Sequence, residues 1–147
     1  MNIKYLTKGY IKQIEGLLNI PVDISSSEIK TFDEFPFVLI IQSNIENSIK
    51  ITIYPLNKDS IIKLSLYGIH ISTKTMKNLS KILYNFPIIH SSGFLRIKNY
   101  FFYECYLNLN FKENKSEDLK ISFDTIRNRF KEIKIEEISL KNNIKEL

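Results

Sequence analysis

Apolar and polar positions alternate most clearly over residues 100–111, a stretch without Gly or Pro. Such alternation predicts a β-strand whose side chains point to two opposite faces. The first face carries Phe101, Tyr103, Cys105, Leu107, Leu109 and Phe111, and the second carries Tyr100, Phe102, Glu104, Tyr106, Asn108 and Asn110. We expect a central strand with its first face in the core. The contacts of the second face are therefore the main functional question.

The first 57 residues predict a helix followed by a β-hairpin. Apolar residues recur at helical spacing over residues 2–18, which is typical of an amphipathic helix. Two β-like runs, 35–42 and 48–54, flank a polar turn and favour a hairpin. Its buried face is expected to carry Ile49, Ile51 and Ile53.

The segment from 58 to 140 predicts an α+β core. We expect a strand over 61–71, a helix over 74–86 capped by Ser72 or Thr73, a strand over 88–98 interrupted near 91–93, and the strand at 100–111. A second helix is expected after a Ser116 cap. Its apolar residues are spaced by four, three, four and three: Leu119, Phe123, Ile126, Phe130 and Ile133.

The last segment, 133–140, decides the topology and fits either a strand or a continuation of that helix. A strand makes residues 60–140 β-α-β-β-α-β, the ferredoxin-like order, preceded by the helix and hairpin. A helix makes the whole chain α-β-β-β-α-β-β-α. Both are α+β folds with helices on one face of a largely antiparallel sheet. We expect one domain over 1–147, with 1–57 as an N-terminal extension, 58–140 as the core and 141–147 as a tail.

The net charge of +5 is concentrated in the middle of the chain. Residues 61–111 carry six basic residues and a single acid, Glu104, whereas the segments on either side are close to neutral. A basic segment favours an anionic partner such as nucleic acid. The whole chain has only three Arg, so bidentate recognition of bases or phosphates has few residues to use.

Motifs that carry enzyme chemistry are missing from the sequence. It has one cysteine, Cys105, four Gly, and no HExxH, CxxC, GxSxG or glycine-rich phosphate loop. His70 and His90 fall at opposite ends of the expected sheet, too far apart to share a metal ion. These absences favour a non-enzymatic protein without deciding the question, and we expect no metal and no cofactor. Without an apolar run of about 20 residues we expect no membrane contact and a cytoplasmic protein.

The second face of the central strand is the main candidate surface. In the ferredoxin-like order this strand lies between the strands that carry Tyr67 and Arg96, so cations and aromatic side chains are expected to share that surface: Lys63, Ser65, Tyr67, Phe94, Arg96, Lys98, Phe102, Glu104 and Tyr106. Such a mixture suits base stacking, and it suits equally a face covered by protein. A lysine stripe on the first core helix, Lys74, Lys77 and Lys81, is a second candidate for anion binding.

Two resemblances extend these expectations. The element order over 60–140 resembles that of RNA-recognition motifs, and Tyr67 and Phe102 fall near their base-stacking positions, although residues 97–100 lack the basic-Gly-aromatic signature. This resemblance implies binding of single-stranded nucleic acid. The same order is similar to amino-acid-sensing ACT domains, which implies a ligand loop at His70 and Ser72, although that loop lacks the usual Pro-Gly.

Three functions follow from these surfaces. The first is a non-enzymatic interaction or regulatory module that binds a protein partner or a second copy of itself. The second is a single-stranded nucleic-acid-binding domain, and the third is an enzyme or a sensor of a small, amino-acid-like ligand near His70 and Ser72.

Overall fold

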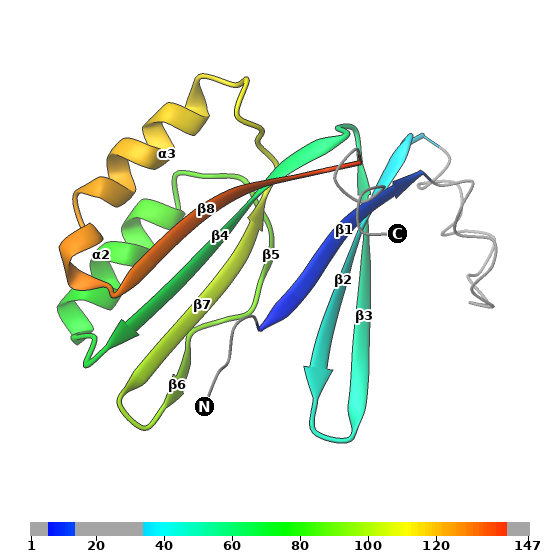
Figure 1. Cartoon of the computed structure of the whole chain (residues 1–147). Helices are drawn as coiled ribbons and strands as arrows, with labels where there is room; N and C mark the ends of the chain where they lie inside the picture. The colour runs from blue at the N-terminus through cyan, green and yellow to red at the C-terminus, as the bar shows by residue number, and fades with distance from the viewer. Residues whose placement is uncertain (1–5, 14–33, 141–147) are drawn as a thin grey trace. The chain divides into compact units, whose positions relative to one another are not determined.

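A computed structural model describes residues 6–13 and 34–140 (Figure 1). The elements are β1 (Thr7–Gln13), β2 (Phe37–Ile45), β3 (Ser48–Leu56), β4 (Ser60–Ile69), α2 (Thr73–Leu83), β5 (Ile88–Ser91), β6 (Leu95–Ile97), β7 (Tyr100–Leu107), α3 (Lys115–Asp124), a short 3-10 helix η2 (Arg127–Arg129) and β8 (Glu132–Ser139). They form two compact units, Met1–Leu6 with Ile61–Glu137, and Thr7–Ser60 with Ile138–Leu147. The α+β class with largely antiparallel sheets is confirmed.

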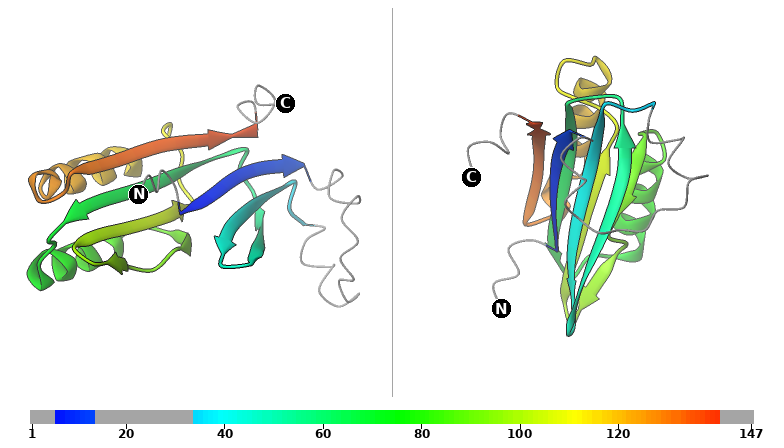
Figure 2. Two further views of the ribbon diagram at one scale, coloured as in Figure 1. Left: turned by 60° about the horizontal axis from the view of Figure 1, so that its bottom comes forward. Right: turned by 90° about the vertical axis from the view of Figure 1, so that its right-hand side faces the viewer.

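The larger unit is built on a five-stranded sheet with the order β5-β7-β4-β8, in which β6 also pairs with β7. Strand β7 is antiparallel to β4, β5 and β6, which confirms that the aromatic strand is central. Strand β8 runs opposite to β4 (Figure 2). Helices α2 and α3 both lie on one face of this sheet (Figure 1). The other face is called the outer face below.

The core lies between the sheet and the two helices. Strand β7 contributes Phe101, Tyr103, Cys105 and Leu107, as the alternation predicts, and β4 contributes Ile62, Leu64 and Leu66. Burial of a large aliphatic or aromatic side chain stabilises a fold by roughly 1.5–3 kcal/mol. Phe111 was expected on the core face but is 40% exposed, because β7 ends at Leu107.

Helix α2 begins where the sequence predicts. Ser72 is its N-cap, and its Oγ accepts a hydrogen bond of 3.1 Å from the amide of Thr75. Residues 84–87, which end in Phe86 and Pro87, lead from the helix into the edge strand. The interrupted strand of the prediction is present as β5 and β6, separated by a break that contains Gly93 at φ 72°.

The predicted second helix is only partly correct. Helix α3 starts after Asn114, which is its N-cap in place of Ser116, and it ends at Asp124. Ile126, Phe130 and Ile133 are nevertheless buried in the core. Ile126 lies in a turn, Phe130 directly follows η2, and Ile133 lies in β8. The regular spacing therefore indicates which residues are buried and does not indicate a continuous helix. The alternative with a C-terminal helix is wrong, since Glu132–Ser139 is a strand.

The smaller unit contains a three-stranded antiparallel sheet in the order β1-β2-β3. The predicted N-terminal helix is wrong over Thr7–Gln13, which is strand β1 paired with β2. Residues 2–5 and 14–18 of that prediction lie outside the described residues. Gly9 faces Ile41 of β2.

The predicted hairpin is confirmed as β2 and β3 with a turn at Glu46 and Asn47. Its buried side was assigned to the wrong strand. Ile49 and Ile51 are 62% and 51% exposed, whereas Val38, Leu39, Ile40 and Ile41 of β2 are all buried. Strand β2 is the central strand of this sheet and pairs with β1 on one side and β3 on the other. It is therefore more buried than the edge strand β3.

Candidate functional site

The outer face of the five-stranded sheet holds most of the residues predicted to form a binding surface. Cross-strand pairs between β4 and β7 place these residues opposite one another: Lys63 and Tyr106, Ser65 and Glu104, Tyr67 and Phe102, Ile69 and Tyr100. Directly opposed residues point to the same side of a sheet, so these pairs form two rows on one face. The end that contains Lys63 and Glu104 is polar and buried, and the end that contains Tyr67 and Tyr100 is aromatic and partly exposed.

The aromatic end forms a continuous patch. The Tyr67 ring lies 5.2 Å from the Phe102 ring and 6.2 Å from the Tyr100 ring, between centroids. Strand β6 extends the patch, because Leu95 pairs with Phe102 and Ile97 pairs with Tyr100. The aromatic patch is defined here as Tyr67, Ile69, Leu95, Ile97, Tyr100 and Phe102. Tyr100 is 44% exposed and Leu95 is 38% exposed, so large apolar side chains face solvent.

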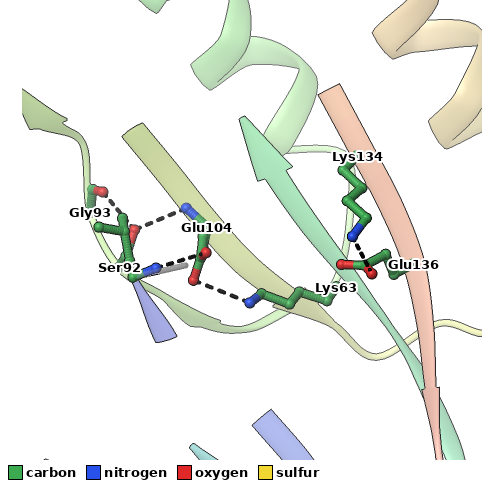
Figure 3. Close-up of polar contacts among 7 residues, drawn as sticks. Lys63, Ser92, Gly93, Glu104, Lys134 and Glu136 are labelled. Atoms are coloured by element: carbon green, nitrogen blue, oxygen red, sulfur yellow. Dashed lines mark hydrogen bonds and ion pairs between the residues drawn. The ribbon is translucent and has the colours of Figure 1, made fainter. Parts of the chain in front are cut away.

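The polar end contains a buried ion pair. Lys63 Nζ lies 3.3 Å from Glu104 Oε2, and both side chains are about 95% buried (exposed fractions 6% and 5%). Glu104 Oε1 also accepts a hydrogen bond of 3.0 Å from the amide of Leu6. Figure 3 shows Glu104 between Ser92 and Lys63, with a second pair, Lys134 and Glu136, on β8. Glu104 is therefore a structural partner of a lysine.

Tyr106 was predicted to be part of a binding surface, and the structure buries it completely. Lys63 Nζ lies 5.5 Å from the centre of its ring, and the His90 ring lies 6.1 Å away in an edge-on arrangement. Tyr106 thus belongs to the buried polar end and is separate from the aromatic patch.

Phe94 and Arg96 do not lie on the outer face. Phe94 packs on Phe101 and Tyr103 at 5.7 and 5.0 Å between ring centroids. Arg96 is paired with Phe101, and its Nη2 donates a 2.8 Å hydrogen bond to the carbonyl of Ile71. Both residues are therefore on the side of the sheet that carries the helices. Lys98 is exposed in the turn before β7, at φ 54°.

A one-residue slip in pairing explains this difference. In β5, His90 pairs with Tyr106, whereas in β6, Leu95 pairs with Phe102, which is one residue out of step. A slip by one residue moves every later side chain to the opposite face. Leu95 and Ile97 consequently occupy the places predicted for Phe94 and Arg96. The glycine and serines at 91–93 signal a break, but they do not reveal how many residues it inserts.

Ser72 of the predicted ligand loop has a structural role, because its hydroxyl caps α2. His70 is exposed, at φ 54°, and its amide donates a 2.9 Å hydrogen bond to the carbonyl of Asn99. His90 lies in β5 beside Tyr106, so the two histidines sit near opposite ends of β7. Within residues 6–13 and 34–140, no three His, Cys, Asp or Glu residues gather in a way that could hold a metal ion.

The lysine stripe is exposed as predicted. Lys74, Lys77 and Lys81 all lie on the solvent side of α2, while Leu79 and Leu83 are buried beneath it. None of the three is within ion-pair distance of a carboxylate in the described part of the chain.

Cys105 is expected to react with a thiol reagent only after unfolding. Its side chain is buried in the core, and burial raises the pKa of its thiol to about 12. The group is therefore protonated at neutral and mildly alkaline pH, and only the thiolate is nucleophilic. A disulfide reagent followed by absorbance should show slow labelling of the native protein and fast labelling in denaturant. Native labelling as fast as that of free cysteine would contradict this assignment.

Comparison with known protein families, curated proteins and solved structures found no match to this chain. No helix in the described ranges has the length and apolar character needed to cross a membrane.

Proposed function

We propose that this protein is a non-enzymatic interaction module that uses the aromatic patch to bind a second copy of itself. The observation that carries the proposal is the exposure of Tyr100 and Leu95 beside the ring contacts of Tyr67 and Phe102. Exposed apolar patches of this kind often mark protein interfaces, where aromatic residues are enriched.

The chemistry of the patch favours self-association. In a twofold dimer each subunit presents the same surface to the other, so a charged patch would repel itself. The aromatic patch contains no charged side chain, because the slip in β6 turns Arg96 to the opposite side. The same displacement weakens the alternative of base stacking on this face, since Tyr67 and Phe102 lack an adjacent arginine.

We also propose that the larger unit has the ferredoxin-like arrangement. The strand order β5-β7-β4-β8, with α2 between β4 and β5 and α3 between β7 and β8, supports it. The cytoplasmic location, the single-domain organisation and the regulatory role stay predictions.

Introducing a charge into the aromatic patch is expected to separate the dimer. Tyr100→Glu and Leu95→Glu should each weaken self-association at least about tenfold, because a buried unpaired charge is costly at an interface. Light scattering over a dilution series measures the change. The matched control is Ile121→Glu, since Ile121 is 63% exposed on α3 and lies away from the patch.

The control should associate like the unchanged protein, and all three variants should unfold at similar denaturant concentrations. A chain that is monomeric at every concentration would refute self-association. Equal loss of association in Ile121→Glu would refute the assignment to the outer face.

A further inference from the structure

The exposed charge of residues 61–111 is entirely positive. The one acid in this segment, Glu104, is buried against Lys63, and these two charges compensate each other. The other five basic residues, Lys74, Lys77, Lys81, Arg96 and Lys98, are all exposed. Residues 61–111 therefore expose five cations and no carboxylate to solvent.

Three of these cations, Lys74, Lys77 and Lys81, line one side of α2 and are called the basic face, whereas Arg96 and Lys98 belong to the β6–β7 hairpin. Lys74, Lys77 and Lys81 follow α2 at spacings of three and four, so they share one side of it over about 10 Å. Arg96 reaches the start of α2, with Nη2 at 2.8 Å from the Ile71 carbonyl and 3.5 Å from Met76 Sδ. Lys98 lies in the turn that the His70 amide ties down through the Asn99 carbonyl.

The basic face is poorly suited to stabilising its own helix. Helix α2 has no acid in its first turn, where Lys74 opposes the helix dipole, and only Lys81, in the last turn, complements it. Lys77 and Lys81 are four residues apart, and like charges at that spacing repel. In contrast, α3 and its surroundings pair Lys120 with Glu117 at 3.3 Å and Arg127 with Asp124 at 2.9 Å. Two ion pairs thus compensate charges on and beside α3, whereas the structure shows no ion pair for the three lysines of α2 in the described part of the chain.

An exposed aromatic ring stands at the end of the same stripe. Tyr84 directly follows α2 and is 91% exposed, and it continues the spacing of Lys77 and Lys81. It makes none of the ring contacts found among the described residues. A free aromatic face beside cations is the combination that proteins use to hold unpaired bases.

We infer that the basic face and Tyr84 bind single-stranded nucleic acid. The three lysines contact backbone phosphates, and Tyr84 stacks on an unpaired base. Recognition is independent of nucleotide sequence. Arg96 is the one arginine of residues 61–111, and it already donates a hydrogen bond to a carbonyl, so it is poorly placed for bidentate contacts with base edges. An anionic membrane fits less well, since membrane-surface helices expose apolar side chains, and those of α2 are turned into the core. This surface is distinct from the aromatic patch and does not depend on self-association.

The salt dependence of binding to a labelled oligo-dT or oligo-U tests the phosphate contacts. Replacing Lys74, Lys77 and Lys81 by Gln should reduce the magnitude of the slope of log affinity against log salt by about 2. Each lost phosphate contact removes about 0.7 from the slope, and three contacts are lost. The matched control replaces Lys112, Lys115 and Lys120 by Gln, which removes the same charge from the α3 side. The control should keep the slope of the unchanged protein.

Tyr84→Ala tests the stacking contact separately. It should weaken binding by about five-fold to a hundred-fold with an unchanged salt slope. The inference fails if the full chain does not bind the oligonucleotide, or if both triple variants lose slope equally. It fails in favour of an acidic protein or a membrane if polyglutamate or phosphatidylserine vesicles bind as tightly and Tyr84→Ala has no effect.

Discussion

Replacing Glu104 by Ala is expected to lower the free energy of unfolding by about 3–5 kcal/mol, because it removes the carboxylate that lies 3.3 Å from the buried ammonium of Lys63. The pair is formed at 3.3 Å with both side chains almost fully buried. The variant also removes the acceptor of the Leu6 amide. Urea denaturation of the variant and the unchanged protein measures the loss.

The control for this prediction restores neutrality. In the double variant Lys63→Met with Glu104→Gln, no charge is left buried and the Gln side-chain oxygen can still accept from Leu6. Removing both members of a buried pair is often close to neutral, so the double variant should recover most of the loss. A single variant that behaves like a surface substitution, or a double variant as unstable as the single one, would show that the pair is not buried as described.

Phe123→Ala is expected to cost about 3–5 kcal/mol, the range for removing a fully buried phenylalanine. Phe123 has an exposed fraction of 0%, whereas Ile121 on the same helix is 63% exposed. Ile121→Ala should change stability by less than about 0.5 kcal/mol. Denaturation of both variants measures which side of α3 faces the sheet, and equal losses would contradict the packing described here.

The larger unit was predictable where local signals and tertiary packing agree. Alternation in β4 and β7 placed Leu64 and Phe101 in the core, and a capping serine with helical spacing located α2. In each of these elements the apolar residues follow a single clear spacing over seven or more residues. The expected order of elements also placed β7 between β4 and the strand at 88–98, and the structure pairs β7 with β4, β5 and β6.

The errors arose where an apolar spacing fits more than one conformation. Residues 7–13 fit a helical stripe, but pairing with β2 overrides this local preference and Ile11 is buried within a strand. Phe130 and Ile133 continue the spacing of α3 although the helix has ended, because residues from three different elements enter one core. Periodicity in these segments identified the buried residues and not their secondary structure.

The candidate surface was only half predictable. Tyr67 and Phe102 lie together as expected, since they face each other across an uninterrupted ladder. Leu95, Ile97 and Tyr100 were not identified as site residues, and Arg96 was placed on the wrong side. The cause is a slip of one residue between β5 and β6, which depends on backbone geometry near Gly93.

The most direct test of the proposed interaction surface is a dilution series of two-dimensional NMR spectra of the isotopically labelled chain. We expect concentration-dependent shifts at Tyr67, Leu95, Tyr100 and Phe102, and unchanged signals at Lys77 and Ile121 on the helix side. Spectra that do not change with concentration, or shifts confined to α2 and α3, would contradict the assignment of the aromatic patch as the interface.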